Sequence, residues 1–232
     1  MPWPLAIAIA FLCGSIPFGL LIARARGLDI RQHGSRNIGA TNVGRVLGRP
    51  WGVACFMLDA GKGFAPVAAA GIAHGLWGRA PCEMTSSAQW LWLATAVAAL
   101  LGHLFPPWLR FRGGKGVATG FGALLAIWPT LTVAALVALA LWIVCVVATR
   151  YVSVASIVAG VSVPMTVAIS AALGPGGRAG GVAAAVPFLV GTSLLAVLVV
   201  WRHRANMARL LHGEELRVGR KKERQAMDRT GT

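Results

Sequence analysis

Long apolar segments separated by short polar ones dominate the chain, and each is close to the roughly 20 residues that a helix needs to cross a bilayer. The six clear segments run at about residues 5–23, 51–73, 90–109, 131–149, 153–173 and 182–201. A seventh, about 116–128, is short and rich in glycine, and Pro129 ends it, so by itself it could equally be a re-entrant segment. This pattern predicts an all-α, polytopic membrane protein.

The composition agrees with this prediction. Of the 232 residues, 56% are hydrophobic and only 12% are charged, whereas a soluble domain has about 25% charged residues. The formal net charge of +15 could suggest a nucleic-acid partner. However, the basic residues lie between apolar segments, and no nucleic-acid-binding module is present. We therefore expect no nucleic-acid partner and attribute the charge to membrane topology.

The distribution of basic residues decides the topology. The first apolar segment has no basic residue before it and is followed directly by Arg24 and Arg26, the reverse of a secretory signal. With seven spans, every Lys and Arg except Arg79 and Arg178 falls on the inner side. If residues 116–128 were re-entrant, the C-terminal basic cluster would lie outside. We therefore predict seven transmembrane helices, one of them short, with the N-terminus outside and the C-terminus cytoplasmic.

This topology predicts a single transmembrane domain at residues 1–204. Its cytoplasmic loops, at 24–50, 110–116 and 150–153, are the candidate positions for an active site. The remaining residues, 205–232, form a basic cytoplasmic tail that we expect to fray or to lie on the lipid surface, and not to form a site.

The polar stretch at residues 29–45 is the first candidate site. Three evenly spaced glycines, Gly34, Gly39 and Gly44, allow tight turns and a close approach of backbone N–H groups to a ligand. Neutral hydrogen-bonding groups and positive charges come from Ser35, Asn37, Thr41 and Asn42, and from Arg31, Arg36 and Arg45. An excess of donors with repeated glycine suits an anion, above all phosphate. The alternative is a basic loop that only obeys the positive-inside rule.

A second candidate anion site begins the short fourth span. Gly113, Gly114 and Gly116 flank Lys115, so that free N–H groups, the helix dipole and an ammonium group would converge. The stretch is not a Walker phosphate loop, because Leu109 and Gly116 occupy positions where that motif requires glycine and Ser or Thr.

The third candidate lies at the inner end of the last span. His203 and Asn206 are three residues apart, so on a helix they share a face and could both point at one ligand. The alternative for His203 is an interfacial residue without a chemical role. Asp59 and Lys62, also three apart, are the acid–base pair inside a span, and we interpret them as a structural ion pair.

Several other chemistries are excluded by absent residues. The inner side has no cysteine, no clustered carboxylates and no metal-ligand spacing, which argues against thiol, metal or glycosidase chemistry. We expect no metal and no cofactor. Two anion sites and a His–Asn pair at a lipid interface suggest a group transfer that joins a phosphate compound to an apolar group.

Seven short motifs also carry a family resemblance. They are Gly14-Ser-Ile-Pro-Phe-Gly, Gly34-Ser-Arg-Asn-Ile-Gly-Ala-Thr-Asn-Val, Leu58-Asp-Ala-Gly-Lys-Gly, Gly102-His-Leu-Phe-Pro, Gly113-Gly-Lys-Gly-Val-Ala-Thr-Gly, Arg150-Tyr-Val-Ser and Arg202-His-Arg-Ala-Asn. Together they resemble the bacterial acyl-phosphate:glycerol-3-phosphate acyltransferases of the PlsY type, over about residues 12–216. Arg36 departs from the family pattern, which more often has Gly or Lys there; this concerns loop shape and not the reaction.

The resemblance implies that an acyl group passes from acyl phosphate to the 1-hydroxyl of sn-glycerol 3-phosphate, giving lysophosphatidate and inorganic phosphate. On this basis Ser35 and the backbone of the second site bind the acyl-phosphate head, and Lys115 neutralises the leaving phosphate. Arg45 holds glycerol 3-phosphate. His203 and Asn206 orient the attacking hydroxyl, with either His203 or a substrate phosphate as the base. The predicted substrate-binding residues are Asn37, Gly39, Thr41, Asn42, Gly113, Gly114 and Gly116.

The resemblance also implies a location and partners. We expect the bacterial inner membrane, an active site on its cytoplasmic face, contact with membrane lipids, and functional coupling to the soluble enzyme that makes acyl phosphate. The alternative function is a transporter for an organic phosphate. Transporters tend to place polar groups at mid-membrane within repeated halves, whereas here the polar loops lie on one side and no repeat is present.

Overall fold

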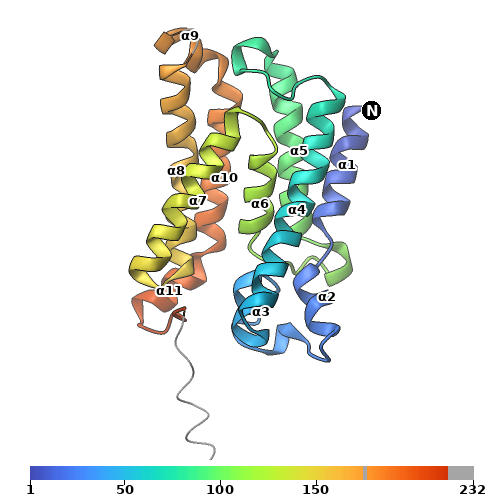
Figure 1. The fold of residues 1–232 in the computed structure, drawn as a ribbon, viewed down its shortest axis with the longest axis vertical. Coiled ribbons are helices and arrows are strands. Elements are labelled where there is room, and N and C mark those ends of the chain that lie inside the picture. The colour runs from blue at the N-terminus through green and yellow to red at the C-terminus, as the bar shows by residue number, and fades with distance from the viewer. Residues whose placement is uncertain (175–176, 219–232) are drawn as a thin grey trace, which may run out of the picture.

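The computed structural model describes residues 1–174 and 177–218, and all regular structure in that part of the chain is helical. The elements are α1 (Trp3–Gly14), α2 (Phe18–Arg24), η1 (Ile30–Gln32), α3 (Ala40–Leu47), α4 (Arg49–Ala73), η2 (Pro81–Glu83), α5 (Ser86–Leu104), η3 (Pro107–Leu109), α6 (Val117–Leu125), α7 (Thr130–Thr149), α8 (Val152–Leu173), α9 (Gly177–Ala184), α10 (Val186–Arg202) and α11 (Arg204–Leu211). The long helices run side by side along the longest axis of the molecule (Figure 1).

The predicted helical membrane fold is confirmed. Within the described residues, five helical segments are long and apolar enough to cross a membrane. The bent pair of α10 and α11, which meet at 48°, brings the number to six. The short apolar segment predicted at 116–128 forms α6, of only 9 residues. Whether α6 counts as a seventh span, and which side each end faces, stays a prediction.

Two predicted spans are interrupted, both beside proline. The segment predicted at 5–23 breaks between α1 and α2 because Pro17 has no N–H to continue the helix. The segment predicted at 182–201 breaks at Ala185, and α10 starts there with proline in its first turn. Hydropathy alone could not show these breaks, since the residues on both sides of each break are apolar.

The first break explains the buried charge pair. It leaves the carbonyl oxygen of Ile16 free of a helical partner, and this oxygen accepts a hydrogen bond of 2.6 Å from Nζ of Lys62. The same ammonium forms an ion pair of 2.7 Å with Asp59, and both side chains are buried. The predicted structural role of this pair is confirmed, since it ties α4 to the α1–α2 corner.

Helices pack at backbone contact where glycine allows it. A Cβ atom on Gly63 would overlap the carbonyl oxygen of Thr119, and one on Gly122 would overlap that of Ala60, so α4 and α6 are in direct backbone contact. His103 of α5 adds a hydrogen bond of 3.2 Å to the hydroxyl of Thr119. These contacts fix the start of α6 between α4 and α5.

The polar loops meet at one end of the molecule. The chain reverses direction at each long helix, so that α2, α3, the connection before α6 and α11 all lie at the lower end of Figure 1. The N-terminus and α9 lie at the opposite end. All three candidate stretches from the sequence are therefore at the same end of the helical bundle.

Candidate functional site

Lys115 and Asn206 form the centre of the site. Nζ of Lys115 donates a hydrogen bond of 2.5 Å to Oδ1 of Asn206, so the second and third candidate stretches are brought together. The amide group of Asn206 in turn donates a bond of 2.6 Å to Oε1 of Glu215. Asn206 is buried and Lys115 is half-buried, so the ammonium group is held in place without being sealed from a ligand.

The surroundings of Lys115 are strongly positive. Its pKa is lowered to about 8, first by burial and then by the charges of Arg209, Arg202 and Arg45, while the carboxylate of Glu215 acts in the opposite direction. Arg45 of the first candidate stretch is thus close enough to Lys115 for its charge to lower the pKa of Lys115, as Arg202 and Arg209 do. Four cations around one carboxylate leave an excess of positive charge that favours an anionic ligand.

His203 lies between α10 and α11 with 2% of its surface exposed. Its Nδ1 is 2.8 Å from the carbonyl oxygen of Val199. Because a carbonyl can only accept, Nδ1 carries the proton, and in the neutral ring Nε2 keeps its lone pair. His203 is therefore held in the tautomer that a proton acceptor needs.

Asn42 has a structural role that the sequence did not predict. Its amide nitrogen donates to the carbonyl oxygens of His33 (3.0 Å) and Asn37 (2.8 Å), and its oxygen accepts from the N–H of Ser35 at 2.8 Å. Only 1% of its surface is exposed. These contacts show that Asn42 braces the loop that presents Ser35 and Asn37, and direct binding of substrate by Asn42 stays a prediction.

The other residues of the first stretch surround the start of α3. Oδ1 of Asn37 accepts the N–H of Gly39, which is the N-cap of α3, and Thr41 lies exposed in the first turn. The side chain of Ser35 is exposed. The first turn of a helix has N–H groups without helical partners, so this end of α3 offers donors to an anion.

The glycines of the second stretch also have a structural role that the sequence did not predict. The N–H groups of Gly113 and Gly114 donate to the carbonyl oxygens of Leu104 (3.1 Å) and His103 (3.2 Å). These two N–H groups are therefore already engaged in this structure, and a binding role for Gly113 and Gly114 stays a prediction. Because a Cβ on either glycine would overlap the end of α5, they are needed for close packing.

Gly116 allows the left-handed backbone turn that leads into α6. Its φ of 80° lies in the left-handed region that glycine tolerates, and it is the N-cap of α6. The free N–H groups at this end belong to the first turn of α6, which starts at Val117. An anion beside Lys115 would face these N–H groups, and not those of the preceding glycines.

The sequence missed Glu215 and Arg202. Glu215 accepts hydrogen bonds from Ser153 (2.9 Å) and Arg209 (3.0 Å) in addition to Asn206, and therefore joins α8 to α11. Arg202 donates a bond of 2.5 Å to the carbonyl oxygen of Gly114. The adjacent acids Glu214 and Glu215 within a basic segment were the available signal for Glu215. Within the predicted tail at 205–232, Asn206, Arg209 and Glu215 belong to this cluster, and residues 219–232 lie outside the described residues.

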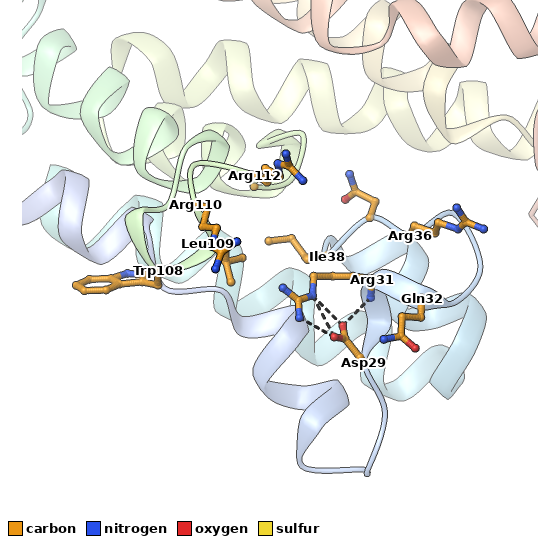
Figure 2. A pocket seen from close by; sticks show the side chains of 11 residues that line it. Asp29, Arg31, Gln32, Arg36, Ile38, Trp108, Leu109, Arg110 and Arg112 are labelled. Carbon is orange, nitrogen blue, oxygen red and sulfur yellow. Dashed lines mark hydrogen bonds and ion pairs between the residues drawn. The ribbon is translucent and has the colours of Figure 1, made fainter.

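A cavity of ≈ 720 Å³ lies next to this cluster, between the first loop and the connection from α5 to α6. Figure 2 shows Arg31 and Arg36 on one side of it, with Arg110 and Arg112 on the other. The cavity brings the first and second candidate stretches into one surface.

Comparisons with known proteins match this chain over nearly its whole length. A family model described as glycerol-3-phosphate acyltransferase matches residues 4–213. Proteins named glycerol-3-phosphate acyltransferase from Methylorubrum populi and Desulforudis audaxviator are both 44% identical, covering 94% of this chain and 96% of their own.

Two solved structures are similar as well. Both are of PlsY, described as an integral membrane glycerol 3-phosphate acyltransferase, one in its glycerol 3-phosphate form and one in its lysophosphatidic acid form. Both are 36% identical to this chain, with TM-scores of 0.77 and 0.75, and each covers 94% of it. The matches cover 96% and 95% of the PlsY chains themselves.

Proposed function

Because this chain belongs to the glycerol-3-phosphate acyltransferase family, we propose that it transfers an acyl group from acyl phosphate to the 1-hydroxyl of sn-glycerol 3-phosphate. The products are lysophosphatidate and inorganic phosphate. The observation that carries the proposal is the bond between Lys115 and Asn206, set among Arg45, Arg202 and Arg209. Two phosphorylated substrates need such an excess of cations, and a neutral acceptor alone would not.

In the proposed reaction, the 1-hydroxyl oxygen attacks the carbonyl carbon of acyl phosphate. A new C–O ester bond forms, the C–O bond to the phosphate breaks, and the phosphate leaves with the electron pair. The hydroxyl proton passes either to Nε2 of His203, whose Nδ1 is held by Val199, or to a substrate phosphate oxygen. Since acyl phosphate already has a good leaving group, positioning and charge neutralisation supply most of the catalysis.

Each of the five predicted catalytic residues has a place in this proposal. Lys115 and the first turn of α6 neutralise the leaving phosphate. Arg45 holds glycerol 3-phosphate, and Ser35, with the Asn37 and Gly39 turn, supplies donors to the acyl-phosphate head. His203 and Asn206 orient the attacking hydroxyl, and Asn206 is itself oriented by Glu215.

The location follows from charge. The end of the bundle with α2, α3 and α11 carries the site and most of the basic residues. By the positive-inside rule it faces the cytoplasm, where glycerol 3-phosphate and a soluble enzyme that makes acyl phosphate would have direct access. We place the protein in the bacterial inner membrane.

The test is phosphate release by purified protein supplied with acyl phosphate and glycerol 3-phosphate. We expect one phosphate for each lysophosphatidate formed, and no release above the uncatalysed rate when glycerol 3-phosphate is omitted. Release without an acceptor would indicate a hydrolase. Uptake of glycerol 3-phosphate into vesicles without any product would favour the transporter.

A further inference from the structure

The cavity beside the site is a distinct feature of the surface. It is lined by the first loop, Asp29, Arg31, Gln32, Arg36, Asn37 and Ile38, and by the second connection, Trp108, Leu109, Arg110, Arg112 and Gly113. None of the five proposed catalytic residues lines it. Its volume of ≈ 720 Å³ exceeds what glycerol 3-phosphate needs and falls within the range of sites for larger organic ligands.

Its charge is only partly balanced within the protein. Arg31 pairs with Asp29 at 2.6 Å, and the hydrogen bonds from Arg31 lower the pKa of Asp29 to about 2. Arg36, Arg110 and Arg112 are exposed, and their side chains have no hydrogen bond or ion pair with any other described residue. Three guanidinium groups therefore remain available around the cavity, and guanidinium groups match phosphate oxygens in geometry.

Exposed aromatic groups lie among these arginines, on and beside the wall of the cavity. Trp108, which lines the cavity, is 64% exposed, and Phe111, which belongs to the same segment but does not line the cavity, is 62% exposed. Nε1 of Trp108 donates a bond of 2.8 Å to the hydroxyl of Ser15, at the end of α1. Trp108 therefore lies at the end of the spanning segment Ser86–Leu109 and beside the break between α1 and α2; aromatic belts occupy such span ends.

We propose that this cavity binds the head group of an anionic phospholipid. The phosphate lies between Arg110, Arg112 and Arg36, and the acyl chains leave past Trp108 and Phe111 into the bilayer. A lipid head group and a soluble compound such as glycerol 3-phosphate both present a phosphate ester to these arginines. A lipid fits better than a soluble anion because Arg110 and Arg112 lie on the same short segment as the exposed Trp108 and Phe111, at the end of the spanning segment Ser86–Leu109.

The cavity adjoins the proposed substrate site at Asn37, but Arg36, Arg110 and Arg112 have no role in the proposed reaction, so lipid binding to them can be measured without turnover. The test is a lipid titration of the purified full chain in neutral detergent, followed by native mass spectrometry. The probes are phosphatidylglycerol and phosphatidylcholine with matched acyl chains. We expect the first phosphatidylglycerol to bind at least about tenfold more tightly than phosphatidylcholine.

The matched variants are R110Q/R112Q, inside the cavity, and R24Q/R49Q, at the same end of the bundle but outside the lining. Each pair removes two positive charges. We expect R110Q/R112Q to lose most of the preference for phosphatidylglycerol and R24Q/R49Q to keep it. R36Q, on the opposite wall, should lose part of the preference by itself, and it serves as the test if the double variant does not fold.

Two results would overturn the proposal. An equal loss in R24Q/R49Q would show that only the overall positive charge attracts the lipid. Displacement of phosphatidylglycerol by inorganic phosphate or glycerol 3-phosphate at millimolar concentration would show that the cavity takes a soluble anion. Loss of acyltransferase activity, in contrast, has no bearing on either result.

Discussion

Lys115 connects the two halves of the site. Its ammonium group bonds to Asn206 on α11, while its backbone leads directly into α6. The neighbouring carbonyl of Gly114 is held by Arg202. A charge fixed in this way needs little reorganisation when negative charge develops on a departing phosphate, which is where preorganised groups contribute most to catalysis.

Replacement of Lys115 by alanine should therefore remove most of the activity. Loss of one preorganised contact to transition-state charge costs about 3 to 4 kcal/mol, or a few hundredfold in kcat. The measurement is kcat for Lys115→Ala against wild type in detergent, with Lys62→Met as a structural control. Lys115→Ala should keep the wild-type melting temperature, whereas Lys62→Met leaves Asp59 buried and unpaired and should lower it. A reduction of less than tenfold in Lys115→Ala would show that this charge has no specific contact.

The pKa of Lys115 gives this contact a pH dependence. Burial, together with the neighbouring arginines, lowers that pKa from its usual 10.5 to about 8. The charged form is present below this value and is lost as the pH rises through it. We expect kcat/KM for glycerol 3-phosphate to fall above about pH 8, and Lys115→Arg to lack this fall because a guanidinium stays charged. An identical fall in Lys115→Arg would assign the titration to another group.

At the level of single residues, the sequence predicted which side chains meet at the candidate site better than which ones hold them in place. Lys115, His203 and Asn206 were recognisable because charged and polar side chains are rare beside apolar spans. The bracing role of Asn42 could not be recognised in the sequence, because its partners are backbone carbonyls of a loop whose path depends on the fold. Glu215 was missed for the same reason, since it bonds Ser153, 62 positions away.

Among the helices, α6 is the element on which the site depends most. It is short, its first turn faces the anion site, and its position is set by backbone contact with α4 at Gly122 and Ala60. The sequence predicted a short, glycine-rich helix here. It could not predict the contact, because a glycine in a membrane helix marks a close approach without naming the partner.

Gly122→Val should displace α6 and so disturb the site from a distance. A Cβ there would overlap the backbone of Ala60, whereas a Cβ on Gly120, in the same helix, would meet only the side chain of Leu100 at 3.8 Å. We expect Gly122→Val to lower both the melting temperature and the activity, and Gly120→Ala to change little. Assays of both variants in the same detergent make the comparison, and equal tolerance would mean that the α4–α6 contact does not position the site.

For the whole molecule, alternating chain direction brings the loop after α2, the connection before α6 and the end of α10 to one end of the bundle. This single-ended site was the main prediction from charge, and the structure confirms that the loops meet. The helix breaks were not predictable from hydropathy, although both lie next to proline. Orientation in the membrane remains a prediction of the positive-inside rule.

Thiol accessibility tests that orientation. Cys82 is exposed at the end opposite the site and is a native reporter. Cysteines placed at Arg36 and Arg112 in a background without native cysteines should react only from the cytoplasmic side, and Cys82 restored alone only from outside. Labelling of positions 36 and 112 from opposite sides would contradict a single-ended site.

The most direct test of the central claim is the choice of acyl donor. The site offers a lysine, helix N-terminal N–H groups and arginines, which suit a phosphate head without a nucleotide or a carrier protein attached to it. Purified protein should be given acyl phosphate, acyl-CoA or acyl carrier protein at matched chain length, with glycerol 3-phosphate as acceptor. We predict that only acyl phosphate yields lysophosphatidate. Comparable turnover from acyl-CoA or the carrier-bound acyl group would contradict the account.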